Sequence, residues 1–150
     1  MTVPADKTAG TDRLAILIDE LHRAWAYTDA LWLDLDDDEL HWRPHEQSSA
    51  IGWHLGHQAA VGHFMVRNLL AAETSPDPEL DRVMDSATAE PDRGVLAPRQ
   101  RLADYRSAVA GRVVARLDDV RSGRVGAPDQ LRVVATTLVT ALVNHEYQHD

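Results

Sequence analysis

The chain has 150 residues, a formal net charge of -9 and no cysteine. The lack of cysteine excludes disulfides, a thiolate metal site and a cysteine nucleophile. The acidic charge argues against nucleic acid and anionic membranes as main partners, since both attract basic faces. No secretory signal and no run of about 18 apolar residues occurs. We therefore expect one soluble, cytoplasmic domain over residues 1–150.

A first helix is predicted from about Thr11 to Trp32, because apolar side chains recur there at three- and four-residue steps. Its predicted inward-facing residues are Leu14, Leu17, Ile18, Leu21, Trp25, Thr28 and Leu31. The acidic segment DLDDDEL follows, which we interpret as a solvated turn or the start of a short helix and not as a metal site. Pro44 then interrupts the pattern.

A second helix is predicted from an N-cap at Ser48 or Ser49 to about Ala72. Its predicted inward face consists of Trp53, His57, Val61, Phe64 and Asn68, with Ala60 and Met65 beside it. The polar stretch 74–98 contains four of the seven prolines. It predicts a linker with one short helix around PELDRVMD.

A third helix is predicted from Arg99 to Arg121, and the segment SGRVGAPD ends it. The residues in phase on this helix are Leu102, Tyr105, Val109, Val113 and Leu117. A fourth helix begins near Pro128, since proline is favoured at the first helical position. Its inward stripe is predicted to be Leu131, Val134, Leu138, Leu142, His145 and His149.

Four amphipathic helices and no convincing strand predict an all-α four-helix bundle. Short links should make the first and second helices, and the third and fourth, antiparallel neighbours. The link between the second and third helices is long enough to run the length of a helix. A crossover there makes these two helices parallel and predicts an up-down-down-up bundle.

The chain ends with LVNHEYQHD, in which His145 and His149 are four residues apart and Glu146 lies between them. The spacing alone is a weak signal. However, both histidines continue the apolar stripe of the fourth helix, and rings four apart on one face suit two ligands of one ion. A metalloprotease would need a further ligand and a sheet, and a di-iron bundle a second Glu-x-x-His, so both interpretations are disfavoured.

The third ligand is expected from the second helix, where WHLGH contains His54 and His57. His57 lies on the inward stripe, and His54 is rotated by about 60° to one side. In an up-down-down-up bundle the start of the second helix lies level with the end of the fourth. We therefore predict a metal site formed by His57, His145 and His149, with His54 as the alternative to His57.

SSAIGWHLGHQ in the second helix and NHEYQHD in the fourth resemble the DinB-like (DinB/YfiT) metal-binding superfamily. The W-x-x-x-H and H-E-x-Q-H-D segments are similar to the N-terminal domain of ergothioneine-forming sulfoxide synthases. The resemblance implies an up-down-down-up bundle with one divalent ion on three histidines, and it places the ligands at His57, His145 and His149. It also implies S-transferase or isomerase chemistry with a low-molecular-weight thiol as cosubstrate.

The expected ion is Zn, Ni or Fe, since three imidazoles suit all of them. A bound ion acidifies water or a thiol, so we expect a thiol-dependent S-transferase or a metal-dependent hydrolase acting on a small molecule. Glu146 is the candidate catalytic base, although a solvent-facing position is the simpler expectation for it. Two alternatives are a non-catalytic, metal-stabilised or stress-associated binding module and a helical homodimer whose histidines bind no metal.

The remaining expectations concern histidines, tryptophans and arginines. His63 should be partly exposed, and the surface should hold His22, His41 and His45. The tryptophans expected to close the core are Trp25, Trp32, Trp42 and Trp53, of which Trp42 and Trp53 are also candidate walls of a pocket near the metal. Arg43 and Arg67 should form salt bridges or bind a substrate carboxylate. Members of this family continue the fourth helix past its last ligand, so a chain ending at Asp150 is expected to be truncated or to have its last turn held by the metal.

Overall fold

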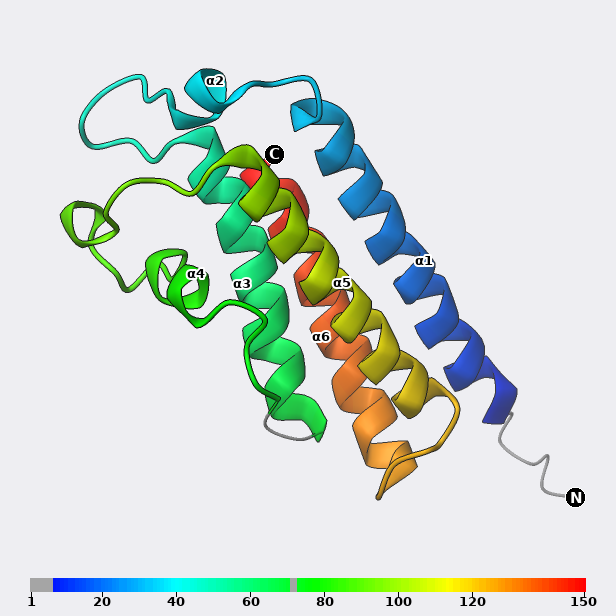
Figure 1. Ribbon diagram of the computed structural model, residues 1–150. Helices are drawn as coiled ribbons and strands as arrows, with labels where there is room; N and C mark the ends of the chain where they lie inside the picture. The colour runs from blue at the N-terminus through cyan, green and yellow to red at the C-terminus, as the bar shows by residue number, and fades with distance from the viewer. Residues whose placement is uncertain (1–6, 71–72) are drawn as a thin grey trace, which may run out of the picture.

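The computed structural model describes residues 7–70 and 73–150, and in these ranges its regular secondary structure is entirely helical (Figure 1). The long helices are α1 (Lys7–Trp32), α3 (Ile51–Leu70), α5 (Arg99–Arg121) and α6 (Pro128–His149). The short ones are α2 (Asp37–His41), α4 (Pro78–Val83) and the 3-10 helix η1 (Glu90–Asp92). The all-α prediction is confirmed. None of the described helices is long and apolar enough to cross a membrane.

Local signals set several helix boundaries. The predicted limits of α5 and the predicted start of α6 agree with the structure. Asp36 caps α2, and Asp77 caps α4 by accepting a hydrogen bond from the Leu80 amide. Helix α1 begins at Lys7, earlier than predicted. The predicted end of the second helix at Ala72 lies outside the described residues.

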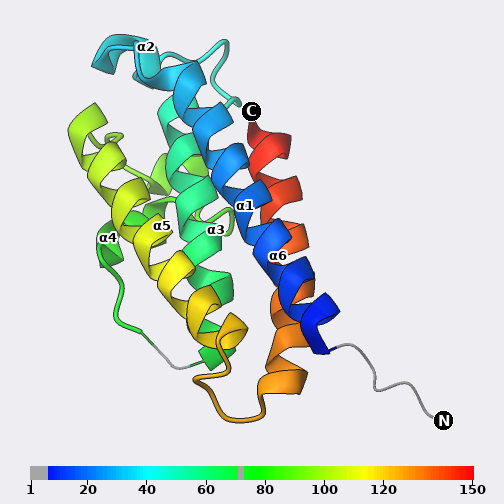
Figure 2. The same cartoon turned by 90° about the vertical axis from the view of Figure 1, so that its right-hand side faces the viewer.

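Contacts between the long helices fix their directions. Near the start of α3, Gln58 donates to the Glu146 carbonyl near the end of α6, so these helices are antiparallel. Arg106 near the start of α5 donates to the Leu55 carbonyl near the start of α3, so these two are parallel. Helices α1 and α6 are parallel to each other, and both are antiparallel to α3 and α5 (Figures 1 and 2).

The predicted pairing of the first two long helices is wrong. Helix α1 packs chiefly against α6, and α3 packs chiefly against α5. The segment between α1 and α3 is not a short hairpin, because it contains α2 and a further loop that crosses the end of the bundle (Figure 1). This length of chain allows α3 to lie beside α5 and α6.

The core lies between the four long helices, and its predicted face on α5 is confirmed at every position. On the other helices, three residues predicted to face inward are exposed: Leu31, Phe64 and Val134. Trp42, predicted to close the core, is exposed as well. Helix α6 buries Leu142, as predicted, and also Ala135 and Val139, which lay outside the predicted stripe. The side chain of Asn68, predicted to face inward on the second helix, lies outside the described set.

Helix α3 closely approaches Met84, the residue that follows α4. A Cβ atom added to Gly56 would lie 2.5 Å from the sulfur of Met84. Met84 is completely buried. The Met84 side chain therefore occupies space that position 56 leaves free by carrying no side chain.

We predict that Gly56→Ala lowers the free energy of unfolding by about 1–3 kcal/mol, because the new methyl group displaces Met84 from a packed core. Gly111→Ala is the matched control, since a Cβ there meets nothing within 4 Å. Alanine's higher helix propensity should make that variant more stable by up to about 1 kcal/mol. Urea unfolding measures both changes, and equal stabilisation of the two variants would contradict the packing described.

Candidate metal centre

The three predicted ligand histidines meet where the start of α3 lies beside the end of α6 (Figure 1). One ring nitrogen from each of His57, His145 and His149 lies within 4.8 Å of the other two. The ring centroids of the three pairs are 4.5 to 5.0 Å apart. The site thus joins two helices that are far apart in the sequence.

One distance in this cluster matches the geometry of a metal ion. His57 Nε2 and His145 Nε2 are 3.3 Å apart. A tetrahedral ion with metal–nitrogen bonds of about 2.0–2.1 Å places its ligand nitrogens about 3.3–3.4 Å apart. These two rings therefore already have the separation that a shared ion requires.

The orientation of His57 comes from the segment that follows α4. Its Nδ1 lies 2.7 Å from the Met84 carbonyl oxygen, which can only accept, so Nδ1 carries the proton. Nε2 then presents its lone pair to the other histidines, as in metal sites where a second partner fixes the tautomer. Trp53 stacks on the same ring at a centroid distance of 4.7 Å, and its indole N–H donates to the Val83 carbonyl.

His54, the alternative ligand, lies beside the cluster and does not belong to the group of mutually close nitrogens. Its Nδ1 is 2.8 Å from Nδ1 of His149. One of these nitrogens must donate and the other accept. If His149 binds a metal through Nε2, its Nδ1–H donates to His54, which makes His54 a support for that ligand.

All four histidines are held in the neutral form that binds metals. Burial is the largest cause and lowers the pKa of His54, His57, His145 and His149. For His149, burial together with the neighbouring imidazoles lowers the pKa to about 4. At neutral pH no proton has to leave before an ion binds.

Each of the three clustered histidines is followed in the chain by a polar residue that points to a different cluster. These residues are Gln58, Glu146 and Asp150. The Gln58 amide donates to the Glu146 carbonyl and to the Asp150 carboxylate, both at 2.9 Å. The hydroxyl of Thr28 on α1 is 2.9 Å from the Glu146 carboxylate and 2.8 Å from that of Asp150. It has a single proton, so it donates to one carboxylate at a time.

The guanidinium of Arg106 on α5 completes this second cluster. Its Nη1 donates to the Leu55 carbonyl and to the Gln58 amide oxygen, and its Nη2 donates to Glu146, each at 2.9 Å. Asp29 on α1 lies 3.7 Å away. Arg106 is 9% exposed. One buried cation therefore links α1, α3 and α6 to α5. Two of its partners, Gln58 and Glu146, directly follow histidines of the cluster in the chain.

The expectation that Glu146 faces solvent is wrong, because this residue is 3% exposed. Burial raises the pKa of its carboxyl, and Arg106 and Thr28 oppose that rise. The periodicity of α6 could not reveal this, since the partner lies on α5. The available signal was Arg106 itself, which follows Leu102 by one helical turn and so occupies an inward position where a cation needs a buried anion.

The other predicted residues lie outside the histidine cluster. His63 is buried, not partly exposed, and its Nε2 is 3.8 Å from Asp81. His22 and His45 are exposed, as predicted, and His41 is half-buried. Arg43 forms the expected salt bridge, with Glu90. Arg67 lies over the Phe64 ring at 5.6 Å.

Comparison with known families identifies the superfamily of the chain. A family model of the DinB superfamily matches residues 20–150, which include all the histidines of the cluster and Arg106. No curated protein and no solved structure matches the chain.

We predict that the metal-free protein loses stability as the pH falls from 7 to about 5, before most carboxylates titrate. In the unfolded chain the imidazoles take up protons near their ordinary value of 6.5, whereas His149 in the folded protein stays neutral down to about 4. The unfolded state therefore binds more protons in this interval, and the free energy of unfolding must decrease as the pH is lowered. His149→Gln should flatten the curve obtained by urea unfolding at several pH values. An equally steep curve for the variant would contradict the pKa shift.

We predict that Arg106→Met lowers the free energy of unfolding by about 3–5 kcal/mol, because it leaves the Glu146 carboxyl buried without its cation. The double variant Arg106→Met/Glu146→Leu, which removes both charges, should be more stable than the single variant. Chemical denaturation of the three proteins tests this order. A double variant less stable than Arg106→Met would contradict the expectation that Glu146 is destabilising once its cation is removed.

Proposed function

The chain belongs to the DinB superfamily, and from this premise we propose that it binds one divalent transition-metal ion through His57, His145 and His149. The observation that carries the proposal is the convergence of three ring nitrogens within 4.8 Å of one another. The tautomer of His57 supports it, because the bond to Met84 leaves Nε2 free to ligate. Zn, Ni and Fe all suit such a donor set.

We further propose thiol-dependent S-transfer as the reaction, or hydrolysis when water takes the place of the thiol. Three imidazoles leave at least one coordination position open, and a bound ion acidifies a water or thiol in that position. The chain has no cysteine, so the thiol is a low-molecular-weight cosubstrate. The other substrate is a small electrophilic molecule.

The side chains of the site hold and orient the ligands in this proposal. Trp53 and the Met84 carbonyl fix the ring of His57, and His54 supports His149. The Glu146 carboxylate accepts hydrogen bonds from Arg106 and Thr28. We therefore propose that it positions helix α6 and its histidines, and that it is not the catalytic base considered from the sequence.

His54 also supports a second candidate function, a non-catalytic module stabilised by its metal. The ring lies within hydrogen-bond distance of His149, so a rotation could supply a fourth nitrogen to the ion. Sites with four protein ligands are closed and structural, whereas catalytic sites keep a position open. The number of histidines on the ion therefore separates the two functions.

We predict that the purified protein binds one divalent ion per chain and that His57→Ala or His145→Ala weakens binding by more than about 100-fold, since the loss of a ligand should exceed the 10–100-fold effect of losing a supporting group. His45→Ala removes an exposed histidine outside the cluster and should leave the affinity unchanged. Calorimetric titration of the metal-free protein with Zn, Ni and Fe(II) measures this. Equal affinities of the His57→Ala and His45→Ala variants would contradict the site.

Turnover tests separate the two functions. In an S-transferase, consumption of a thiol and a model electrophile requires the ion and is lost in His57→Ala, while His54→Ala keeps the ion with moderately weaker binding. In a closed structural site, no turnover occurs and His54→Ala weakens binding as strongly as His57→Ala.

A further inference from the structure

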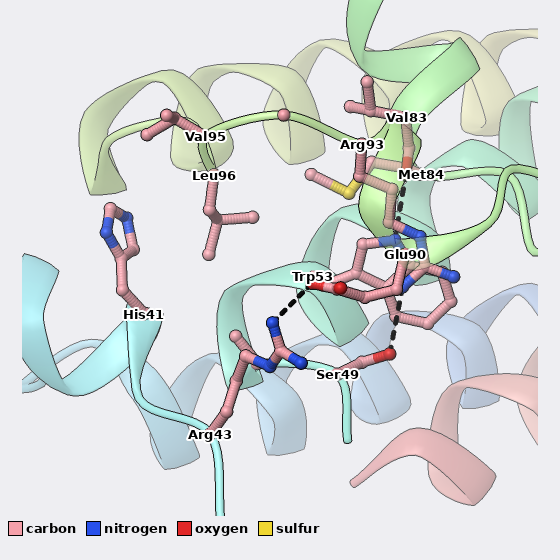
Figure 3. Close-up of a pocket in the computed structure, with 12 residues that line it drawn as sticks. His41, Arg43, Ser49, Trp53, Val83, Met84, Glu90, Arg93, Val95 and Leu96 are labelled. Carbon is pink, nitrogen blue, oxygen red and sulfur yellow. Dashed lines mark hydrogen bonds and ion pairs between the residues drawn. The ribbon is translucent and has the colours of Figure 1, made fainter. Parts of the chain in front are cut away.

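A separate cavity of about 190 Å³ lies between the start of α3 and the segment that leads from α4 to α5 (Figure 3). Its volume corresponds to on the order of six water molecules, enough for a small organic ligand. The side chains that define it are Arg43, Trp53, Met84, Glu90, Arg93 and Leu96. None of the three histidines of the proposed metal site lines it.

The charge in this cavity is unbalanced. Arg43 forms an ion pair with Glu90 at 2.5 Å, which neutralises both groups. Arg93 donates only to uncharged acceptors, from Nε to the Thr88 carbonyl and from Nη1 to the Ser49 hydroxyl, both at 3.0 Å. Glu90 also attracts Arg93 through space, although no ion pair between the two is formed, so one carboxylate faces two guanidinium groups. In a chain of net charge -9, these three groups thus leave one net positive charge in the cavity.

The guanidinium of Arg93 has donors to spare. An arginine has five N–H groups, and the two bonds described use two of them. The remaining donors include both hydrogens of Nη2, which have no acceptor in the described part of the chain. A planar carboxylate matches the Nη1–Nη2 edge and accepts two parallel hydrogen bonds from it.

The surroundings of Arg93 favour an organic anion. The guanidinium carbon lies 4.0 Å from the Trp53 ring, a contact that fixes the plane of the group. Leu96 and the buried Met84 supply apolar surface beside it. Apolar walls suit a hydrocarbon body, whereas a hydrated inorganic anion would lose water contacts against them.

We propose that this cavity binds a small organic carboxylate, with Arg93 as its anchor and the apolar walls as the site for the hydrocarbon part. The proposal does not rest on the metal, since no ligand histidine takes part. Trp53 contacts both Arg93 and His57, so the two sites are neighbours.

The test uses the full chain, treated with a chelator to remove metal, and benzoate as the probe. Titration followed by NMR should show binding that perturbs the indole N–H of Trp53. Benzamide, the uncharged analogue, should bind at least about tenfold more weakly, because it lacks the anionic partner for the guanidinium. Binding of both probes with equal affinity would overturn the proposal.

Two variants and a control assign the anchor. Arg93→Gln should weaken benzoate binding at least about tenfold. Arg93→Lys keeps the positive charge but loses the two parallel N–H donors of the guanidinium, so its affinity for benzoate should be intermediate. The control is Arg121→Gln, because Arg121 is exposed and pairs with Asp118 at the far end of α5. Circular dichroism monitors the fold of each variant, and the comparison of benzoate with benzamide on the unaltered protein needs no variant.

The metal provides the last arm of the experiment. Benzoate binding in the metal-free protein supports the cavity. Binding that appears only after metal is added would show that the anion is a metal ligand, and it would overturn the cavity while leaving the proposed metal site intact. Conversely, loss of metal binding in His145→Ala, a residue that does not line the cavity, should leave benzoate binding unchanged.

Discussion

The buried ion pair between Arg106 and Glu146 is the constraint on which the geometry of the histidine cluster depends. A charge removed from water is costly unless it is paired and hydrogen-bonded. Nη1 and Nη2 of Arg106 meet this requirement only when the Leu55 carbonyl, Gln58 and Glu146 surround them at 2.9 Å. These partners lie on α3 and α6, so satisfying the cation fixes the register of one helix against the other.

This register places the histidines, because Gln58 and Glu146 follow His57 and His145 directly. Successive residues of a helix point about 100° apart. One side of the α3–α6 contact therefore carries the polar cluster around Arg106, and the adjacent side carries the imidazoles. The Met84 carbonyl then fixes the tautomer of His57. The contacts of α3 with α6 and with Met84 thus bring the three ring nitrogens together.

The parts of the fold that the sequence predicts are those decided within one helix. The buried face of α5 follows from a single apolar phase, as Leu102, Val109 and Leu117 show. On α6 two phases are apolar, so periodicity could not choose between Val134, which is exposed, and Ala135, which is buried. The neighbour of α1 was predicted wrongly because the path of the α2 segment decides it.

The same distinction applies to the site. The spacing of His145 and His149, together with helix direction, was enough to predict that they meet His57. The choice between His54 and His57 depends on a carbonyl at Met84, in a segment with no local signal for that contact. The burial of Glu146 and the roles of Arg106 and Arg93 arise from partners on other elements, which a pattern within one helix does not contain.

The most direct test of the central claim, that three imidazoles converge on one ion, is X-ray absorption spectroscopy of the zinc-loaded protein. The account predicts three histidine nitrogens at about 2.0–2.1 Å, with one or more further light atoms that are not imidazole. A first shell with two or fewer imidazoles would contradict the convergence of His57, His145 and His149 on a common ion.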